Sequence, residues 1–292
     1  MAKRGSSQRR YGLWVGGGAI LLLLTAGLLS LKAQIQFPDV RGLDVSPTFE
    51  GWERNPDGTF SLWFGYYNRN NDEEVDVPIG PGNSFDLGNG DQGQPTHFYS
   101  GTRWWVFKVV VPADWPKDKR LVWTLTNRGR TNLAKGWLQP EWEVDDLVIS
   151  ANAGSDPFMS NVTRSIAGNK APAVTGGPAQ TITLPATATL TATVTDDGLP
   201  KPKGLGDRSG KVQGLRVRWI LYRGPGKVQF DPDASPYVYG KPLTAQTNVS
   251  FSVPGNYRIR AIASDGALFS TYDVDVKVNP STSTQTSSKS GG

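Results

Sequence analysis

The sequence holds few side chains whose type and spacing would support catalysis. Its one histidine, His97, lies in the segment 91–98 (DQGQPTHF), and the chain has no cysteine. A catalytic triad needs a Ser or Thr nucleophile beside a base and an orienting group, and no motif marks such a residue. A zinc site needs several nitrogen or sulfur ligands. The sequence therefore predicts no catalytic residues, no enzyme activity and no disulfides.

Acidic side chains supply the hard oxygen atoms that calcium prefers. They stand in two Asp-Gly segments that close expected strands, at Asp196, Asp197 and Asp265. If both strands end at the same end of a sandwich, these carboxylates would hold Ca²⁺; alternatively, both segments only form turns. A similar cluster without the full spacing of a calcium loop consists of Asp86, Asn89 and Asp91. Calcium is the one cofactor that the sequence leaves open, and no other is expected.

Tryptophan is concentrated in one part of the chain, because eight of the ten lie between residues 52 and 142. Neighbours in a strand point to opposite faces, so Trp104 and Trp105 are not expected to face one core. At least one large aromatic side chain should then lie on an outer face. Core or loop-covered packing, a partner-protein interface and a sugar-stacking platform are the three interpretations. The candidate binding residues are Trp63, Trp104, Trp105, Asp91 and His97.

The N-terminal segment predicts delivery to a membrane. Residues 11–31 carry no charge, and the apolar stretch 13–31 is long enough to cross a bilayer as a helix. Basic residues before it predict that the N-terminus stays inside. The anchor residues are Leu13, Leu21, Leu24 and Leu31. We expect a single-pass inner-membrane protein of bacterial type, with its bulk periplasmic or extracellular. The alternative is a signal peptide cleaved after Ala33, which would release a secreted chain.

The net charge of +5 resides in the anchor region rather than in the exported part. Residues 34–170 carry 13 basic and 18 acidic side chains, net −5, and residues 171–292 carry 13 and 8, net +5. The sequence pI of 9.3 therefore does not indicate nucleic-acid binding. Opposite charges would favour docking of the two halves on each other, although chance alone also explains them.

Residues 34–150 are predicted to form a Trp-rich β-sandwich. Aromatic and β-branched runs with a period near two indicate strands at 59–67, 103–111, 120–126 and 142–150. The polar segment 68–100 is too long for an ordinary loop, which makes it either functional or mobile, with a short strand near 75–79. No helical period recurs beyond the anchor.

The region 172–279 resembles the PKD-type, immunoglobulin-like domain of bacterial exported proteins. The resemblance rests on the ordered set of segments 171–185, 188–198, 217–219, 224–228, 255–261 and 263–266. It implies a sandwich with Leu190, Ala192 and Val194 pointing inward, Trp219 in the core and Tyr257 as a tyrosine corner. It also implies a structural or adhesive module that is seldom an enzyme.

The predicted organisation is all-β beyond the N-terminal helix. It comprises a cytoplasmic stub and anchor or signal (1–33), a Trp-rich sandwich (34–150), a linker (151–171), a PKD/immunoglobulin-like sandwich (172–279) and a disordered tail (280–292). We expect a non-enzymatic extracytoplasmic protein, either a cell-surface module or an accessory subunit of a membrane complex. Its expected partners are the membrane and another envelope or membrane protein. Carbohydrate binding is the alternative, and an enzyme acting on envelope polysaccharide is the third hypothesis.

Overall fold

The computed structural model describes residues 40–152, 167–201 and 214–281. All of them lie within one compact unit, Asp39–Gly292. The predicted anchor with Leu13, Leu21, Leu24 and Leu31 falls outside the described residues, as does most of the tail. Among the residues that are described, no helix is long and apolar enough to cross a membrane. The described chain is built of β-sheets with two short helical segments, so the predicted all-β class is confirmed for it.

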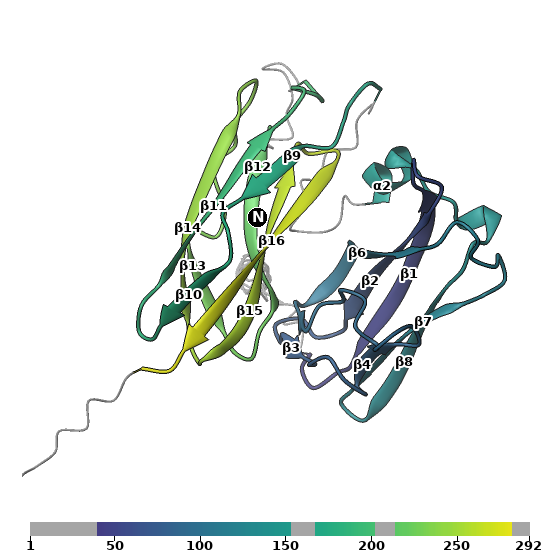
Figure 1. Ribbon diagram of the computed structural model, residues 1–292, viewed down its shortest axis with the longest axis horizontal. Coiled ribbons are helices and arrows are strands. Elements are labelled where there is room, and N and C mark those ends of the chain that lie inside the picture. Colours follow the sequence, from purple (N-terminus) through teal and green to yellow (C-terminus); the bar gives the residue numbers. More distant parts are fainter. Residues whose placement is uncertain (1–39, 153–166, 202–213, 282–292) are drawn as a thin grey trace, which may run out of the picture. The chain divides into compact units, whose positions relative to one another are not determined.

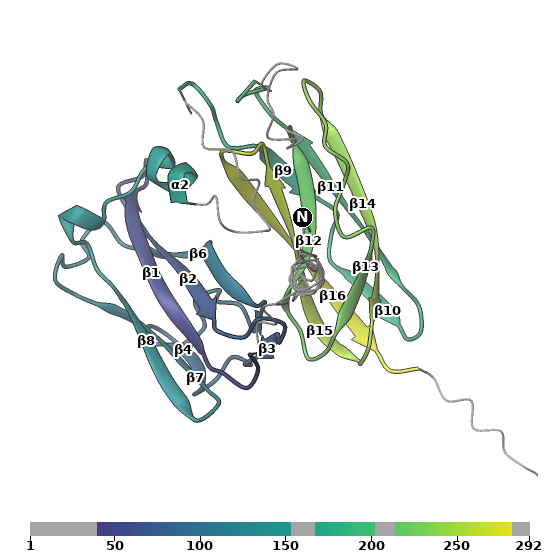
Figure 2. The ribbon, with the colours of Figure 1, turned by 180° about the vertical axis from the view of Figure 1, so that it is seen from behind.

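Two three-stranded sheets form the first sandwich (Figures 1 and 2). One sheet has the order β1-β2-β6 and consists of β1 (Val45–Arg54), β2 (Phe60–Asn68) and β6 (Gly101–Val111). The other has the order β4-β7-β8 and consists of β4 (Asn83–Phe85), β7 (Leu121–Asn127) and β8 (Arg130–Gly136). A small pair within the segment between β2 and β6 consists of β3 (Val75–Asp76) and β5 (His97–Phe98).

Local turn chemistry explains how the strands of this sandwich are paired. Asn55 accepts a backbone hydrogen bond from Gly58 at 3.0 Å, which closes the turn between β1 and β2. The hairpin of β7 and β8 turns through Arg128 and Gly129, whose φ angles are 51° and 73°. Two successive residues at positive φ are the requirement of the two-residue hairpin turn that matches strand twist. The three strands predicted at 59–67, 103–111 and 120–126 are confirmed as β2, β6 and β7.

Aromatic rings fill the first core, as the Trp-rich sequence suggested. The indole of Trp123 is fully buried and stacks on Phe85 with ring centroids 5.8 Å apart. Phe107 meets the same indole edge-on at 5.1 Å. Edge-to-face and offset stacking add to the hydrophobic stabilisation of such a core. The first core therefore combines a group of large aromatic rings with aliphatic side chains.

The strand predicted at 142–150 is wrong. This segment begins at the end of the 3₁₀ turn η1 (Pro140–Trp142) and runs into the helix α2 (Asp146–Asn152). The side chain of Asp145 accepts a hydrogen bond from the backbone N–H of Val148 at 2.9 Å, which is the geometry of a helix N-cap. The alternating apolar pattern suggested a strand, but Asp145 supplies the helix start and Ile149 the buried contact.

The expectation that Trp104 and Trp105 face opposite sides is also wrong. Strand pairing jumps from Phe64–Phe107 to Tyr66–Arg103, so Gly65 alone stands opposite three residues of β6. Within this bulge Trp105 has φ of 54°, and both indoles join one cluster on the outer face of the sheet. A bulge breaks the alternation on which the prediction depended. Gly65 permits this close approach, since a Cβ atom there would lie 2.4 Å from the carbonyl oxygen of Arg103.

Two four-stranded sheets form the second sandwich (Figures 1 and 2). One has the order β10-β16-β15-β12 and consists of β10 (Gln180–Thr183), β12 (Arg216–Arg223), β15 (Gly255–Ser264) and β16 (Phe269–Asn279). The other has the order β13-β14-β11-β9 and consists of β9 (Ala173–Gly176), β11 (Ala188–Thr195), β13 (Val228–Asp231) and β14 (Leu243–Phe251). Only β10 pairs in parallel, with β16.

The second core follows the alternation of its sequence. Leu190, Ala192 and Val194 are all buried on one face of β11, as predicted. Trp219 is 2 % exposed and lies in the same cluster. The hydroxyl of Tyr257 donates a hydrogen bond to the carbonyl oxygen of Val253 at 2.7 Å, which confirms the predicted tyrosine corner. Each sandwich thus has a core of its own.

Candidate interaction site at the junction of the sandwiches

The long segment between β2 and β6 is fixed by buried amide side chains. Asn83 is fully buried; its amide donates to the carbonyl oxygens of Val77 and Pro95 and its oxygen accepts from the indole of Trp123. Gln94 is also fully buried and donates to the carbonyl oxygen of Gly90 at 2.9 Å. Each amide satisfies backbone groups that would otherwise be buried without partners. The hydrogen bonds of these polar side chains therefore hold the segment in a defined conformation.

The ordered segment meets the edge of β12 in the second sandwich. The backbone N–H of Thr96 donates to the carbonyl oxygen of Tyr222 at 3.1 Å, and Gly224 donates to the hydroxyl of Thr96 at 3.2 Å. The N–H of Leu221 donates to the hydroxyl of Tyr99 at 2.8 Å. The bulge of β12 between Leu221 and Arg223 lies at the same place. The first sandwich thereby covers part of a sheet edge that would otherwise be open.

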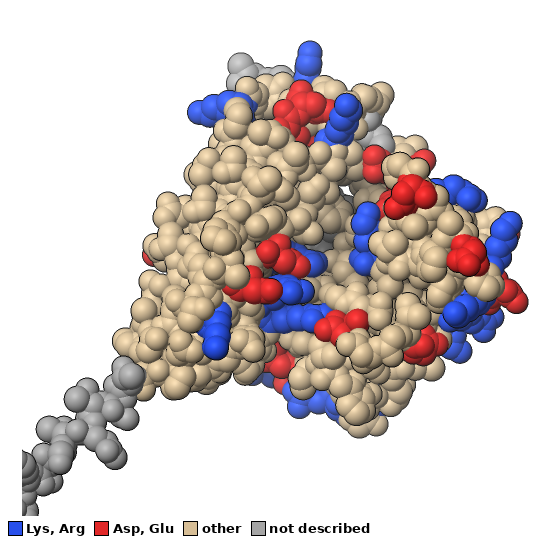
Figure 3. All heavy atoms as spheres, in the orientation of Figure 1, with Lys and Arg blue, Asp and Glu red and all other residues tan. Residues whose placement is uncertain are grey.

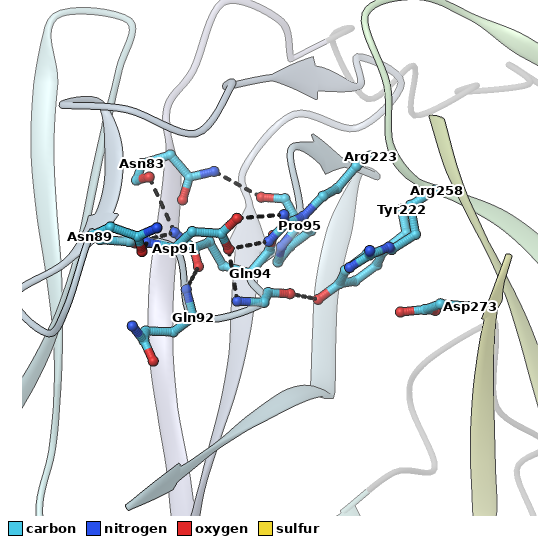
Figure 4. A network of polar contacts seen from close by, with 12 residues as sticks. Asn83, Asn89, Asp91, Gln92, Gln94, Pro95, Tyr222, Arg223, Arg258 and Asp273 are labelled. Carbon is cyan, nitrogen blue, oxygen red and sulfur yellow. Dashed lines mark hydrogen bonds and ion pairs between the residues drawn. The ribbon is translucent and has the colours of Figure 1, made fainter. Parts of the chain in front are cut away.

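A bidentate ion pair joins the two sandwiches at this edge (Figure 4). The guanidinium of Arg223 donates to both carboxylate oxygens of Asp91 at 2.8 and 2.9 Å, and its Nε donates to the carbonyl oxygen of Gln94. The hydroxyl of Tyr222 donates to the carbonyl oxygen of Gly93 at 2.6 Å. Hydrogen bonds from Arg223 hold the pKa of Asp91 below its ordinary value. Fork geometry of this kind fixes orientation as well as adding energy.

A second arginine crosses the junction in a buried position. Arg260 is 7 % exposed, forms two hydrogen bonds to Asp273 at 2.7 and 2.9 Å, and donates to the carbonyl oxygen of Val106. Its guanidinium carbon lies 3.5 Å from the ring centroid of Tyr222, a cation–π contact. Burial lowers the pKa of Arg260, but Tyr222 and Asp273 outweigh burial and raise it. The charge of Arg260 is therefore compensated by the carboxylate of Asp273, the carbonyl oxygen of Val106 and the ring of Tyr222.

His97 carries a charge at the same junction. Its Nδ1 lies 2.7 Å from Asp76 and its Nε2 lies 3.2 Å from Glu74. Burial alone lowers the pKa of His97, but the two carboxylates outweigh burial and raise it to about 9. The imidazole ring meets Tyr99 edge-on with centroids 4.5 Å apart. The ring of His97 thus packs against Tyr99, whose hydroxyl accepts the hydrogen bond from Leu221 of β12.

The predicted aromatic residues lie on the outer face of the sheet β1-β2-β6. Trp63 and Trp105 meet edge-to-face at 6.1 Å, and Phe269 of β16 lies 6.4 Å from Trp63. Ile149 of α2 is buried in the same cluster, against which Trp104 packs. Trp105 is therefore covered, which agrees with loop-covered packing, whereas Trp63 and Trp104 each keep part of their surface exposed.

A cleft of about 530 Å³ opens beside this aromatic cluster. Figure 3 shows acidic and basic side chains gathered beside a hollow in the surface. Its walls carry charged groups from both sandwiches, namely Glu53, Lys108, Asp146, Arg258, Arg260 and Asp273. Its apolar lining includes Trp63, Trp105 and Phe269. A volume of this size fits a small-molecule or oligomer segment rather than a single ion.

All five predicted binding residues therefore lie near the junction. Asp91 and Trp63 contact the second sandwich, and His97 belongs to the segment that docks on it. Trp104 and Trp105 belong to the aromatic cluster that Phe269 of β16 also joins. Sequence reasoning missed the residues of the second sandwich at this junction, which are Tyr222, Arg223, Arg260 and Phe269. The opposite net charges of the two halves were a signal for such docking. The Asp91–Arg223 pair agrees with them, because the acid belongs to the negatively charged half and the base to the positively charged half. The residues Asp91 and His97 are engaged in ion pairs with neighbouring side chains rather than facing each other as an acid and a base.

The calcium candidates separate into two groups. Asp197 is exposed and its two oxygens accept hydrogen bonds from the backbone of Lys170 and Leu199, as in a turn. Asp265 is 4 % exposed, and burial, with the nearby charge of Asp196 as a further cause, raises its pKa to about 6. Asn169, 8 % exposed, donates to Asp265 at 3.0 Å. One buried side-chain oxygen each of Asn169 and Asp196 has no hydrogen-bond partner.

These oxygens fit a calcium site in part. Oxygen atoms from Asn169, Asp196 and Asp265 are of the kind that Ca²⁺ binds, and two of them are left unsatisfied. Within the described ranges, no group of three or more His, Cys, Asp or Glu side chains is arranged to hold a metal. The carboxylates of Asp86 and Asp91 instead accept hydrogen bonds from Val122, Gly93 and Arg223.

Comparison with known proteins finds no matching family model and no matching curated protein. Among solved structures, the PKD domain of human KIAA0319 is 21% identical, covers 44% of this chain and 91% of that chain, with a TM-score of 0.22. Domains 4 and 5 of the S-layer protein SbsC are 12% identical over 81% of this chain and 98% of that chain, with a TM-score of 0.25.

Titin domains z1z2, solved in complex with telethonin, are 12% identical over 81% of this chain and 98% of that chain, with a TM-score of 0.22. Likenesses with TM-scores this low do not by themselves assign a fold to the chain. The strand pairing and the two cores described above carry that assignment, and scores this low carry no functional argument.

Proposed function

We propose that this chain is a non-enzymatic, extracytoplasmic interaction or structural protein whose two sandwiches act as one rigid unit. The observation that carries the proposal is the junction itself. Buried and directional contacts of Arg223, Arg260 and Tyr222 join the sandwiches. Sandwiches joined only by a linker would move independently, whereas these contacts fix their relative orientation. Fixed orientation is what a spacer or an accessory subunit requires.

The N-terminal segment supports membrane attachment. Residues 13–31 are long and apolar enough to span a bilayer, and a basic flank precedes them. We propose that this segment anchors the rigid unit to the inner membrane, with both sandwiches outside the cytoplasm. The partner in this proposal is another envelope or membrane protein.

Exposed apolar side chains near α2 support a protein partner. Trp142, Leu147 and Val148 are 42%, 57% and 37% exposed, and all lie on the segment that leads into and forms α2. Trp is enriched at protein interfaces, and contiguous exposed apolar side chains mark interaction sites. Trp142 stacks on Phe49, with ring centroids 5.4 Å apart, so one of its faces is already supported by the sandwich.

Affinity purification of the full chain from gently solubilised membranes tests the proposal. We expect a partner to co-purify in fixed ratio, and to be lost or reduced when Leu147 is replaced by Asp. The matched control is Val110→Asp, because Val110 is 56% exposed and lies on β6 rather than on α2. Recovery of the chain always alone would contradict the proposal.

A calcium ion is a further proposal for the second sandwich. The unpartnered oxygens of Asn169 and Asp196 beside Asp265 support it. We expect CaCl₂ to raise the melting temperature over EDTA, because an ion that binds only the folded state stabilises it. Asp265→Asn should remove this difference, whereas Asp197→Asn should keep it. An unchanged melting temperature in wild-type protein would show that the Asp-Gly segments serve only as turns.

A further inference from the structure

The cleft beside Trp63 has walls from both sandwiches and a mixed chemical character. From the first sandwich come Trp63, Trp105, Glu53, Lys108 and Asp146. From the second come Phe269, Ser270, Thr271, Asp273, Arg258 and Arg260. Aromatic rings, hydroxyls, carboxylates and cations thus face the same space, so a ligand there meets both apolar and hydrogen-bonding groups.

Most charges around the cleft are already paired. Lys108 lies 2.8 Å from Glu53, Arg260 lies 2.7 Å from Asp273, and Arg258 lies 2.8 Å from Asp275. A charged ligand would have to displace one member of a pair or be left without a counter-ion, both of which cost free energy. A ligand with hydroxyl groups can instead bridge paired groups, because a hydroxyl both donates and accepts.

Asp146 is the one charged side chain of the cleft for which no ion pair is found among the described residues. It begins α2 and faces a neighbourhood that holds both Glu53 and Lys108. Burial, and then the charge of Glu53, raise its pKa above the ordinary value. A cationic ligand attracted to Asp146 would also meet Lys108, Arg258 and Arg260. A hydroxyl donor satisfies the carboxylate without this repulsion.

Trp63 adds an apolar surface to these polar groups. Its side chain is half-buried, is supported by Trp105 and Phe269, and has Lys108 Nζ 5.1 Å from the centroid of its ring. The C–H face of a sugar ring packs on such an indole, and its hydroxyls reach the surrounding polar groups. We propose that the cleft binds a segment of a neutral oligosaccharide.

This inference rests on the proposed function, because only a rigid junction keeps the two walls of the cleft at a constant separation. It names the ligand class of the junction, whereas the proposed protein partner contacts the exposed face of α2. An experiment can therefore reject the proposed protein partner and the proposed sugar ligand independently of each other. Loss of co-purification with intact sugar binding overturns the proposed partner, and absence of sugar binding with an intact partner overturns the inference.

Titration of the full chain tests the inference, in a detergent without a sugar headgroup. The probes are cellotetraose, maltotetraose and chitotetraose, with tetragalacturonate as the anionic comparison, followed by tryptophan fluorescence and calorimetry. We expect at least one neutral probe to bind and quench fluorescence, and the anionic probe to bind more weakly. No binding by any neutral probe, or tighter binding of the anionic one, would overturn the proposal.

Variants locate the binding in the cleft. Asp146→Asn keeps the size of the side chain and should weaken binding by about tenfold, the effect of losing one hydrogen bond to a charged group. Thr271→Val removes an exposed hydroxyl of the opposite wall and should weaken binding by a few-fold. Tyr67→Ala replaces an exposed aromatic residue of β2 that does not line the cleft; it is the matched control and should bind as wild type. Wild-type affinity in both cleft variants, with melting temperatures unchanged, would sink the inference.

Discussion

The two sandwiches solve the same packing problem in different ways. In the second sandwich, β11 alternates buried and exposed residues along almost its whole length, and its core consists largely of aliphatic side chains. In the first, aromatic rings fill the core, and the segment between β2 and β6 depends on Asn83 and Gln94 to satisfy its backbone. Regular alternation predicts from the sequence which residues are buried. The role of a buried amide can be assigned only when its hydrogen-bond partners are known.

The difference has a consequence at the junction. Two irregular parts of the first sandwich meet the second. The amide-held segment meets β12, and Val106 of the β6 bulge accepts a hydrogen bond from Arg260 of β15. The edge of β12, which has a bulge between Leu221 and Arg223, offers backbone groups that an irregular segment can match without extending the sheet. The two sandwiches are therefore joined where the backbone of both departs from regular strands.

The largest expected effect comes from the two core tryptophans. Trp123→Ala should destabilise the protein by about 3–5 kcal/mol through the cavity, and by about 1–3 kcal/mol more because Asn83 loses its donor. Trp219→Ala should cost only the cavity, since its indole nitrogen has no hydrogen-bond partner. Calorimetric unfolding of both variants, with Trp123→Phe and Trp219→Phe alongside, measures the difference. Equal losses in the two Phe variants would contradict the role given to Asn83.

The buried arginine gives the next largest effect. Arg260→Ala leaves Asp273 and the carbonyl oxygen of Val106 without their donor, and should cost about 3–5 kcal/mol. Calorimetry should then resolve separate transitions for the two sandwiches. Arg258→Ala is the control; its pair with Asp275 is largely exposed and should contribute about 0–1 kcal/mol. A single cooperative transition in Arg260→Ala would show that the junction does not couple the two cores.

The junction should also respond to pH through His97. Its pKa is raised from the ordinary value of 6.5 to about 9, so the folded state binds the proton more tightly than the unfolded state. The stabilisation is fully present below pH 6.5 and is lost as the pH rises through about 9. We expect a loss of about 1–3 kcal/mol across this range.

Urea unfolding at a series of pH values measures this loss. In His97→Gln the same range should show a flatter profile, because the group that binds the proton is gone. A wild-type slope in that variant would assign the pH dependence to another residue.

The smallest effect is expected for the exposed side of the junction. Asp91→Asn removes one charge from the pair with Arg223, in which Asp91 is 35% exposed, and should cost about 1 kcal/mol. Small-angle scattering should detect wider relative motion of the sandwiches. Asp233→Asn, which breaks the pair of Arg218 and Asp233 within the second sandwich, should leave the scattering profile unchanged. Identical profiles for all three proteins would show that the Asp91–Arg223 pair does not restrain the junction.

Local patterns were enough for much of the fold. Thr, Val and Leu alternation predicted β11, and Gly255 followed by Tyr257 predicted the tyrosine corner. The same patterns missed β1 and β8, and they placed a strand where Asp145 caps a helix. A period of two in a short apolar run does not distinguish a strand from a helix; here the local cap by Asp145 and the burial of Ile149 beside Trp105 decide for the helix.

The sequence by itself determined the all-β class, the second core and the residue types gathered at the candidate site. Only the tertiary structure decided what those residues contact. Asp91 lies 132 positions from Arg223 and Val106 lies 154 positions from Arg260, so no local pattern links them. The φ of 54° at Trp105 likewise arises from packing across the β6 bulge, which reverses the side-chain alternation that a regular strand would have.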